Sequence, residues 1–300
     1  MLKLWYSPIY SDGIDEQARF PRLRYKMLFS SLEREPKIVF QMPSAIERQD
    51  ILRAHCPDYV QRFLSGTLSE KEARRIGLRP WTDKIIDRTL ILTGGTLEAT
   101  QHAWKHKIAG HLAGGTHHAY YDYGSGYCIF NDLAIGARWL QSRGVERILI
   151  LDLDVHQGDG TARIFQADPS VFTLSVHCAS NFPFRKQQSD LDVALEAHTG
   201  DVAYLNALLC IPEVLDSFQP QFVFFQAGVD PLNCDKLGKL DLTRAGLQKR
   251  NRYVFEQLSS RGIPVVITMG GGYAEPLSKS IEAHTDLFIQ ASHFAHPCFF

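Results

Sequence analysis

The chain has 300 residues, of which 45% are hydrophobic and 22% are charged, so it can bury one large core. Its formal net charge of -1 gives no basic footprint, which argues against nucleic acid and anionic membranes as partners. We expect a single domain over residues 1–300, because α/β domains of this length are common.

Cysteine usage and apolar runs indicate the compartment. The six cysteines are scattered without a C-x-x-C pair, which argues against a disulfide framework or a thiolate zinc site and favours a reducing compartment. Residues 1–8 lack the apolar core of a signal peptide and predict a short first strand. No apolar stretch reaches the length that spans a membrane. We therefore expect a soluble, cytoplasmic protein.

The segment of about 19–88 differs from the rest of the chain. It is charged, helical in places and punctuated by prolines, so we expect helices and a long loop beside the main fold. Beyond it, apolar runs alternate with stretches of helical periodicity. The runs predict buried strands at 147–151, 171–176, 222–226 and 264–269. The other stretches predict helices at 131–142, 202–218 and 243–260. This alternation is typical of a parallel sheet with helices on both faces.

A glycine-bordered loop over 114–118 carries the first candidate chemistry. Its adjacent histidines, His117 and His118, are poor core material because both rings need hydrogen-bond partners. Asp152 and Asp159, farther along the chain, are candidate partners, since a carboxylate fixes the tautomer and raises the basicity of the other ring nitrogen. If a metal site lay beside them, two such pairs would be typical of acid/base machinery.

The apolar run 148–151 leads directly into Asp152, Asp154 and His156. In extended backbone, this period of two points all three side chains to one side. Buried carboxylates are costly unless they are paired or bound to a cation, and carboxylates with an imidazole are plausible ligands of a divalent metal. The carboxyl ends of strands are where open α/β sheets bind ligands. In the alternative interpretation, one Asp caps the next helix and His156 is a buried histidine with its hydrogen bonds satisfied in the core. The shared face of the three side chains would then be a coincidence.

Two later strand ends add further candidates. The run 222–226 is followed by Asp230, which is either a turn residue before Pro231 or, because it repeats the strand-then-acid layout, a third metal ligand. We interpret it as a ligand. The run 265–269 ends in three glycines and Tyr273, whose hydroxyl could donate to a developing oxyanion.

We expect the chain to end in a helix followed by a short tail. Residues 275–292 predict a final helix, and a tail rich in His and Phe follows it. We interpret this tail as a packed or frayed end rather than as a metal site. Its aromatic and imidazole side chains are those of His293, His296, Phe299 and Phe300.

The combined pattern "G-G-x-H-H … G-x-G-[FY]-C … D-x-D-x-H-x-G-D-G … G-x-D … G-G-G-Y" resembles the histone deacetylase family of the arginase/deacetylase superfamily. The matches run from His55 to Tyr273, and the chain is most similar to bacterial and class IV-like members. The resemblance implies a three-layer α/β/α fold around a central, mostly parallel eight-stranded sheet.

The resemblance also implies roles for individual residues. The metal, Zn2+ or alternatively Fe2+, would be held by Asp154, His156 and Asp230. The catalytic residues that it implies are His117 and His118, their partners Asp152 and Asp159, and Tyr273. A structural K+ is implied as well, with ligands from Asp152, the main chain of Asp154 and His156, Ser175 and Val176.

The same resemblance implies a substrate channel. Tyr127 stands where most members have Phe, and Phe182 would form the opposite wall. Gly126 and Gly271 would complete the lining of this channel. Apolar walls of this kind would suit the aliphatic stem of an acylated lysine.

The function that the resemblance implies is metal-assisted hydrolysis of an N-acyl amide, with acyl-lysine on a protein or peptide as the substrate. An amidohydrolase that acts on acetylpolyamines or another small acylated amine would use the same residues, and the sequence leaves it open. An arginase-like ureohydrolase would need a second metal, and the paired histidines argue against it. A non-catalytic acyl-lysine binding module would be expected to have lost a catalytic residue, and none is lost.

Overall fold

The computed structural model describes residues 1–15, 17–78 and 81–295. Within these ranges, eight strands form one sheet in the order β2-β1-β3-β8-β7-β4-β5-β6. Every neighbouring pair is parallel, which confirms the predicted α/β class. The strands are β1 (Leu2–Trp5), β2 (Ile38–Gln41), β3 (Ile108–His111), β4 (Ile148–Asp152), β5 (Val171–Cys178), β6 (Leu191–Leu195), β7 (Phe222–Gln226) and β8 (Val265–Thr268).

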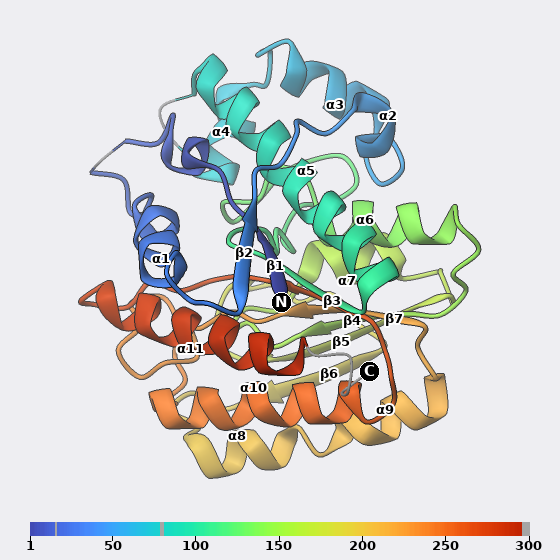
Figure 1. Ribbon diagram of the computed structural model, residues 1–300. Coiled ribbons are helices and arrows are strands. Elements are labelled where there is room, and N and C mark those ends of the chain that lie inside the picture. The colour runs from blue at the N-terminus through green and yellow to red at the C-terminus, as the bar shows by residue number, and fades with distance from the viewer. Residues whose placement is uncertain (16, 79–80, 296–300) are drawn as a thin grey trace.

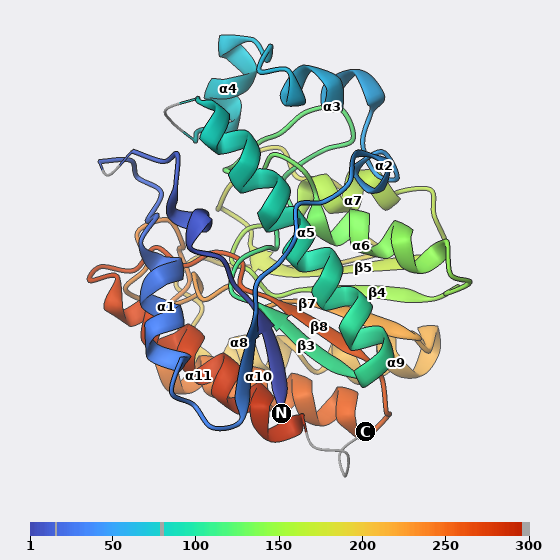
Figure 2. The same ribbon diagram turned by 45° about the horizontal axis from the view of Figure 1, so that its top comes forward.

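Helices cover both faces of the sheet and make the fold three-layered (Figure 1). α5, α6 and α7 lie on one face, and α8 to α11 lie on the other, where α1 packs beside α11 (Figures 1 and 2). The helices are α1 (Arg24–Leu32), α2 (Arg48–Ile51), α3 (Pro57–Leu64), α4 (Glu70–Ile76), α5 (Asp83–His106), α6 (Asp132–Gln141), α7 (Asp159–Phe165), α8 (Asp201–Ala207), α9 (Cys210–Phe218), α10 (Arg244–Ser259) and α11 (Ser278–Phe294), with a 3-10 turn η1 at Pro8–Ser11.

The predicted helix 202–218 is wrong in one respect, because two helices occupy this segment. α8 ends at Ala207 and α9 begins at Cys210. Pro212 lies in the first turn of α9, and a proline ring clashes with the carbonyl of the residue four positions earlier. That residue is Leu208, so the chain breaks between the helices at the position that Pro212 dictates.

Three strands of the sheet were not predicted from the sequence. β2 and β6 are the two edges of the sheet. The apolar run of β2 is only three residues long, from Ile38 to Phe40, and Asp192 interrupts that of β6. β3 is fully buried but has only four residues, and Gly110 and His111 make up half of it. The predicted strands at 147–151, 171–176, 222–226 and 264–269 correspond to β4, β5, β7 and β8.

The strand order brings the predicted site together. β3, β8, β7 and β4 are consecutive in the sheet, and their parallel course places all four carboxyl ends at one edge. The loops that follow these strands carry the paired histidines, the triple glycine with Tyr273, Asp230, and the cluster around Asp154. The site therefore lies where open α/β sheets bind their ligands.

The tail residues His296, Phe299 and Phe300 lie outside the described residues, whereas His293 belongs to α11. The cysteines in the described ranges are free thiols. No helix in these ranges is both long and apolar enough to cross a membrane.

Candidate active site

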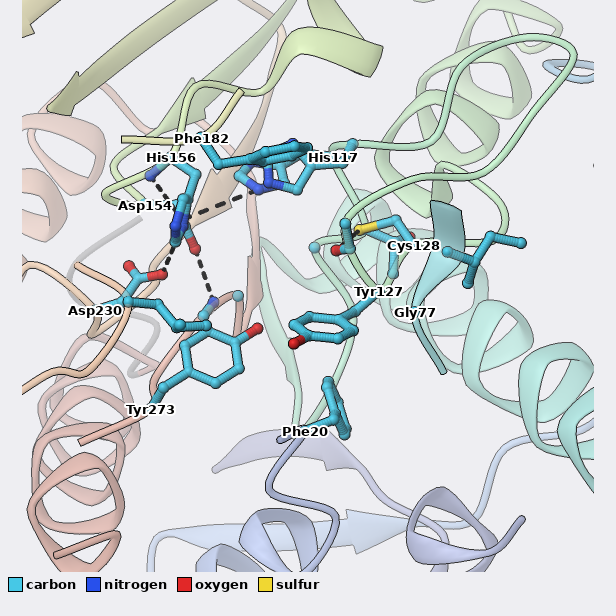
Figure 3. Close-up of a pocket in the computed structure, with 18 of the residues that line it drawn as sticks. Phe20, Gly77, His117, Tyr127, Cys128, Asp154, His156, Phe182, Asp230 and Tyr273 are labelled. Atoms are coloured by element: carbon cyan, nitrogen blue, oxygen red, sulfur yellow. Dashed lines mark hydrogen bonds and ion pairs between the residues drawn. The ribbon is translucent and has the colours of Figure 1, made fainter. Parts of the chain in front are cut away.

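A buried group of Asp154, His156 and Asp230 forms the floor of the site (Figure 3). One ligand atom from each residue lies within 4.8 Å of the others. The His156 Nδ1 atom is 3.1 Å from both Asp154 Oδ1 and Asp230 Oδ2. The remaining oxygens are anchored by main-chain N–H groups, from Gly271 to Asp154 Oδ2 and from Val155 to Asp230 Oδ1. The nitrogen and the two carboxylate oxygens therefore converge on one point.

The charges of this group fit a bound cation. Burial and the neighbouring charge of Asp154 raise the pKa of Asp230 to about 7. Burial opposes protonation of His156, but its hydrogen bonds with Asp154 and Asp230 raise the imidazole pKa to about 10. Two carboxylates thus compete for one imidazole proton, and a divalent ion would neutralise them better. One nitrogen and two carboxylate oxygens are a donor set that suits Zn2+ or Fe2+.

The loop after β8 packs directly against this group. Gly271 contributes an N–H to Asp154, and a Cβ atom at this position would collide with the carboxylate of Asp230. Only glycine permits this approach of the backbone. The triple glycine therefore serves the metal-type group as well as Tyr273, which follows it.

The prediction that Asp152, Asp154 and His156 share one face of a strand is wrong in part. β4 ends at Asp152, and the next residues form a bend, so strand alternation does not extend to Asp154 and His156. Asp152 turns instead toward His117 and lies outside the metal-type group.

Each of the paired histidines is held by a carboxylate, as the sequence predicts. His117 Nδ1 lies 2.6 Å from Asp152 Oδ2, and His118 Nδ1 lies 2.6 Å from Asp159 Oδ1. The two rings lie side by side, with their centroids 4.1 Å apart. Both Nδ1 atoms are taken by carboxylates, which leaves the Nε2 atoms for other partners.

The relative basicity of the two histidines is the reverse of what the spacing suggests. From sequence spacing alone, Asp159, which lies farther from the metal-type residues than Asp152, would make His118 the better base. Burial lowers the pKa of His118 to about 4, and the charge of His117 adds to this effect. For His117, burial is outweighed by Asp152 and Asp154, which raise the pKa to about 9. Asp154 Oδ1 is only 3.9 Å from His117 Nε2, a proximity that the sequence does not reveal.

Asp159 has a second partner that the sequence analysis missed. The hydroxyl of Tyr120 donates to Asp159 Oδ2 at 2.9 Å, while Asp159 Oδ1 faces His118. Tyr120 stacks on Tyr123 with a centroid distance of 4.5 Å. The only sequence signal is that Tyr120 lies two residues after His118, within the same loop.

Tyr273 reaches the cavity from the loop after β8. Its main-chain N–H donates to Asp235 Oδ2 at 2.6 Å, which ties this loop to the one that carries Asp230. The guanidinium of Arg24 lies 5.7 Å from the centre of the Tyr273 ring. Burial raises the pKa of Tyr273 well above its ordinary value, so the hydroxyl keeps its proton.

The metal-type group, both paired histidines and Tyr273 line one cavity of about 450 Å³. Its wall includes Tyr127, Phe182, Gly126 and Gly271, the residues that were predicted to form a channel. Phe182 packs edge-on against His118 with a centroid distance of 4.9 Å, whereas the Tyr127 ring lies beside Tyr273. The two aromatic rings thus border the same space on different sides (Figure 3).

Gly126 and Tyr127 form a strained turn in this wall. Both residues have positive φ angles, and a Cβ atom on Gly126 would lie 2.6 Å from the His118 ring. The Tyr127 N–H donates to the carbonyl of Ile76 at the end of α4. The turn therefore fixes the channel wall to α4 and to the loop that carries His118.

Several lining residues had no sequence signal. Phe20, Arg24 and Arg88 come from the charged segment near the N-terminus, to which we assigned no function. Phe184 and Lys239 border the cavity from two loops beyond β5 and β7. Their side chains are of common types at unremarkable spacings, so only the fold reveals where they lie.

The residues implied as potassium ligands lie at the ends of β4 and β5. Asp152 and Ser175 are register partners across these neighbouring strands, and Val176 follows in β5. Asp152 Oδ1 accepts the main-chain N–H of Asp154. Asp154 and His156 continue from the same strand end, so the five residues are neighbours in the fold.

Comparison with solved structures identifies the class of this fold. The chain superimposes on a crystal structure of an HDAC homolog complexed with SAHA, with a TM-score of 0.84, 25% identity and coverage of 97% of this chain and 84% of that one. A crystal structure of the HDA15 HD domain matches with a TM-score of 0.81 and 21% identity, over 96% of this chain and 90% of that one. The fold is that of the arginase/deacetylase class.

Sequence comparison gives the family. The histone deacetylase domain profile matches residues 18–288. An uncharacterized protein of Picosynechococcus sp. is 46% identical over 286 residues, which span 93% of this chain and 95% of the relative. Acetoin utilization protein AcuC of Staphylococcus aureus is 31% identical, over 88% of this chain and 76% of the relative. A probable deacetylase of Archaeoglobus fulgidus is 32% identical, over 84% and 72%. The chain belongs to the histone deacetylase family, and this membership supports a deacetylase activity for it.

Proposed function

We propose that this protein is a metal-dependent deacylase that hydrolyses N-acyl amides, with acyl-lysine on proteins or peptides as its substrate. One observation carries the proposal: a buried Asp-His-Asp group, two histidines that are each held by a carboxylate, and a tyrosine border a single cavity. Each of these groups alone has structural explanations. Their convergence is what amide hydrolysis requires.

Asp154, His156 and Asp230 would hold the metal, Zn2+ or alternatively Fe2+. When bound there, the ion would polarise the acyl carbonyl and lower the pKa of a water molecule. Gly271 and Val155 orient the two carboxylates through their main-chain N–H groups. The ligands would therefore be preorganised before the ion arrives.

The histidines and the tyrosine would perform the proton transfers and stabilise charge. His118 is unprotonated near neutral pH, so it can accept a proton from the attacking water and return it to the leaving amine. His117, which Asp152 holds, would position the water and supply positive charge. Tyr273 would donate to the carbonyl oxygen as negative charge develops there, and such a donor is typically worth about 3–4 kcal/mol.

The substrate and the remaining cofactor follow from the same assignment. The aliphatic stem of an acyl-lysine would lie between Tyr127 and Phe182, past Gly126 and Gly271. A structural K+ would be held near the site by side-chain and main-chain oxygens of Asp152, Asp154, His156, Ser175 and Val176. We place the activity in the cytoplasm, where the free thiols of the described cysteines would stay reduced.

Two alternatives are less well supported. An arginase-like ureohydrolase needs a second metal, and the described ranges contain one group of metal-type residues. A non-catalytic acyl-lysine binding module would not need both histidine–carboxylate pairs, and both are formed.

The direct test of the proposed function is a substrate panel on the purified protein. The panel contains lysine peptides with acetyl and longer acyl groups, and an acetylated polyamine. We expect release of the free carboxylate from an acyl-lysine peptide, in amounts equal to the free amine formed. Absence of hydrolysis across the panel, with metal bound, would overturn the proposal.

A further inference from the structure

The outer rim of the cavity has a distinctive composition. Among the lining residues, those with exposed side chains are Arg75, Ser180, Phe184 and Lys239, which we call the rim. Two of the four are cations, one is aromatic and none is acidic. The carboxylates that line the cavity, Asp154 and Asp230, are buried at its floor.

Both rim cations are held in place without an acidic partner in the described ranges. Arg75 lies in the last turn of α4, with its guanidinium 4.5 Å from the centre of the Tyr123 ring. Lys239 donates to the carbonyl of Ser180 at 3.0 Å. Asp122, next to Tyr123 in the chain, makes no ion pair with Arg75. The two positive charges are therefore available to a ligand.

The loop that carries Phe184 adds to the positive charge. Lys186 donates to the carbonyls of Asn181 and Pro183, at 2.6 and 2.7 Å, and Arg185 is exposed beside it. Residues 180–186 contain no acidic side chain, and neither do 75–78 nor 237–239. The mouth of the cavity thus carries an exposed cation on each side, Arg75 from α4 and Lys239 from the loop after β7.

Phe184 gives the rim an apolar contact surface. It is 87% exposed, and it packs edge-on against Phe182, which continues into the cavity. An exposed aromatic ring at the mouth of the channel offers a rigid apolar surface against which a bound polypeptide can pack. The rim therefore offers one apolar contact between two positive charges, which suits a polypeptide that carries carboxylates.

We propose that the rim selects acyl-lysine within acidic polypeptide segments, through pairing of Arg75 and Lys239 with carboxylates that flank the acyl-lysine. This inference rests on the proposed function and names its substrate class. The same charges repel acylated polyamines, whose amines remain positive at neutral pH. Exposed ion pairs are weak, so each cation should change kcat/KM by about two- to fivefold.

The experiment uses three acetyl-lysine peptides of equal length whose flanking residues are Glu, Gln or Lys. We expect kcat/KM to fall in that order and the differences to shrink at high salt, because salt screens exposed charges. Arg75→Gln and Lys239→Gln should each reduce the ratio of kcat/KM between the Glu and Gln peptides. Lys249→Gln is the matched control, because it removes the same charge from an exposed position of α10, a helix that does not line the cavity.

The outcomes separate this inference from the proposed function. Equal kcat/KM on the three peptides, faster hydrolysis of an acetylpolyamine, or a preference that both rim variants retain would overturn the rim proposal. Loss of hydrolysis on every peptide would overturn the proposed function instead. In that case, fluorescence anisotropy of the labelled Glu and Lys peptides still tests the rim, and equal affinities would contradict it.

Discussion

The two histidine–carboxylate pairs look alike in the sequence but differ in their surroundings. Asp152 lies near Asp154, so His117 feels two negative charges. Asp159 shares its charge with the hydroxyl of Tyr120, and His118 lies beside the more positive His117. Distances between side chains on different loops decide this asymmetry. Sequence spacing could predict the pairs, but it could not predict which imidazole is protonated.

Tyr120 should act through Asp159, since it does not line the catalytic cavity. Tyr120→Phe keeps the aromatic stack and removes the hydrogen bond, so Asp159 and His118 should be less well oriented. We expect kcat to fall by about tenfold with KM unchanged, the typical value of a hydrogen bond to a charged group. Steady-state kinetics measure this, with Tyr121→Phe as the control because Tyr121 is an exposed neighbour. If Tyr121→Phe lowered kcat more than Tyr120→Phe, the loss would reflect disturbance of the whole loop and not the hydrogen bond to Asp159.

The pH dependence should report the lowered pKa of His118. A base must be unprotonated, and a pKa of about 4 keeps His118 unprotonated at every pH above that value. The rate should therefore fall only as the pH drops toward 4, well below the 6.5 of an ordinary histidine. The profile of kcat tests this, with metal content measured at each pH to separate loss of the ion. An acidic limb at 6.5 or above, with metal still bound, would contradict the account.

At the scale of elements, four strand ends and their loops build the site. The apolar runs predicted β4, β5, β7 and β8, and the acids that follow β4 and β7 predicted the metal-type group. β2 and β6 were missed because their apolar runs are short or interrupted, and β3 because it is short. The break between α8 and α9 was readable from Pro212, yet helical periodicity on both sides obscured it. The rim residues could not be predicted, since they come from three separate segments.

The loop after β8 offers a test of this construction. Gly271→Ala adds a methyl group against the Asp230 carboxylate, so the metal-type group should be displaced. We expect metal affinity to fall at least about tenfold while the far-UV circular dichroism is unchanged. Gly200→Ala is the control, because the Cβ atom there has its nearest neighbour at 3.8 Å. Equal metal affinity in both variants would show that the close approach of this loop is unimportant.

At the scale of the whole molecule, we propose that residues 1–300 form one domain. The buried hydrophobic residues form one cluster that runs from Leu2 to Ala291 and includes both helical layers. Chemical unfolding should therefore show coincident transitions by tryptophan fluorescence and far-UV circular dichroism. Separate transitions for the two probes would indicate that the segment before α5 unfolds as a unit of its own.

The central claim is that the deacylase activity depends on a metal held by Asp154, His156 and Asp230. The most direct measurement is acetate release from an acetyl-lysine peptide before and after removal of the metal by a chelator, and after return of Zn2+ or Fe2+. We expect one equivalent of transition metal per chain, loss of nearly all activity without it, and recovery on its return. Asp154→Ala should fail to recover under the same conditions. Full acetate release from protein shown by elemental analysis to be free of metal would contradict the claim.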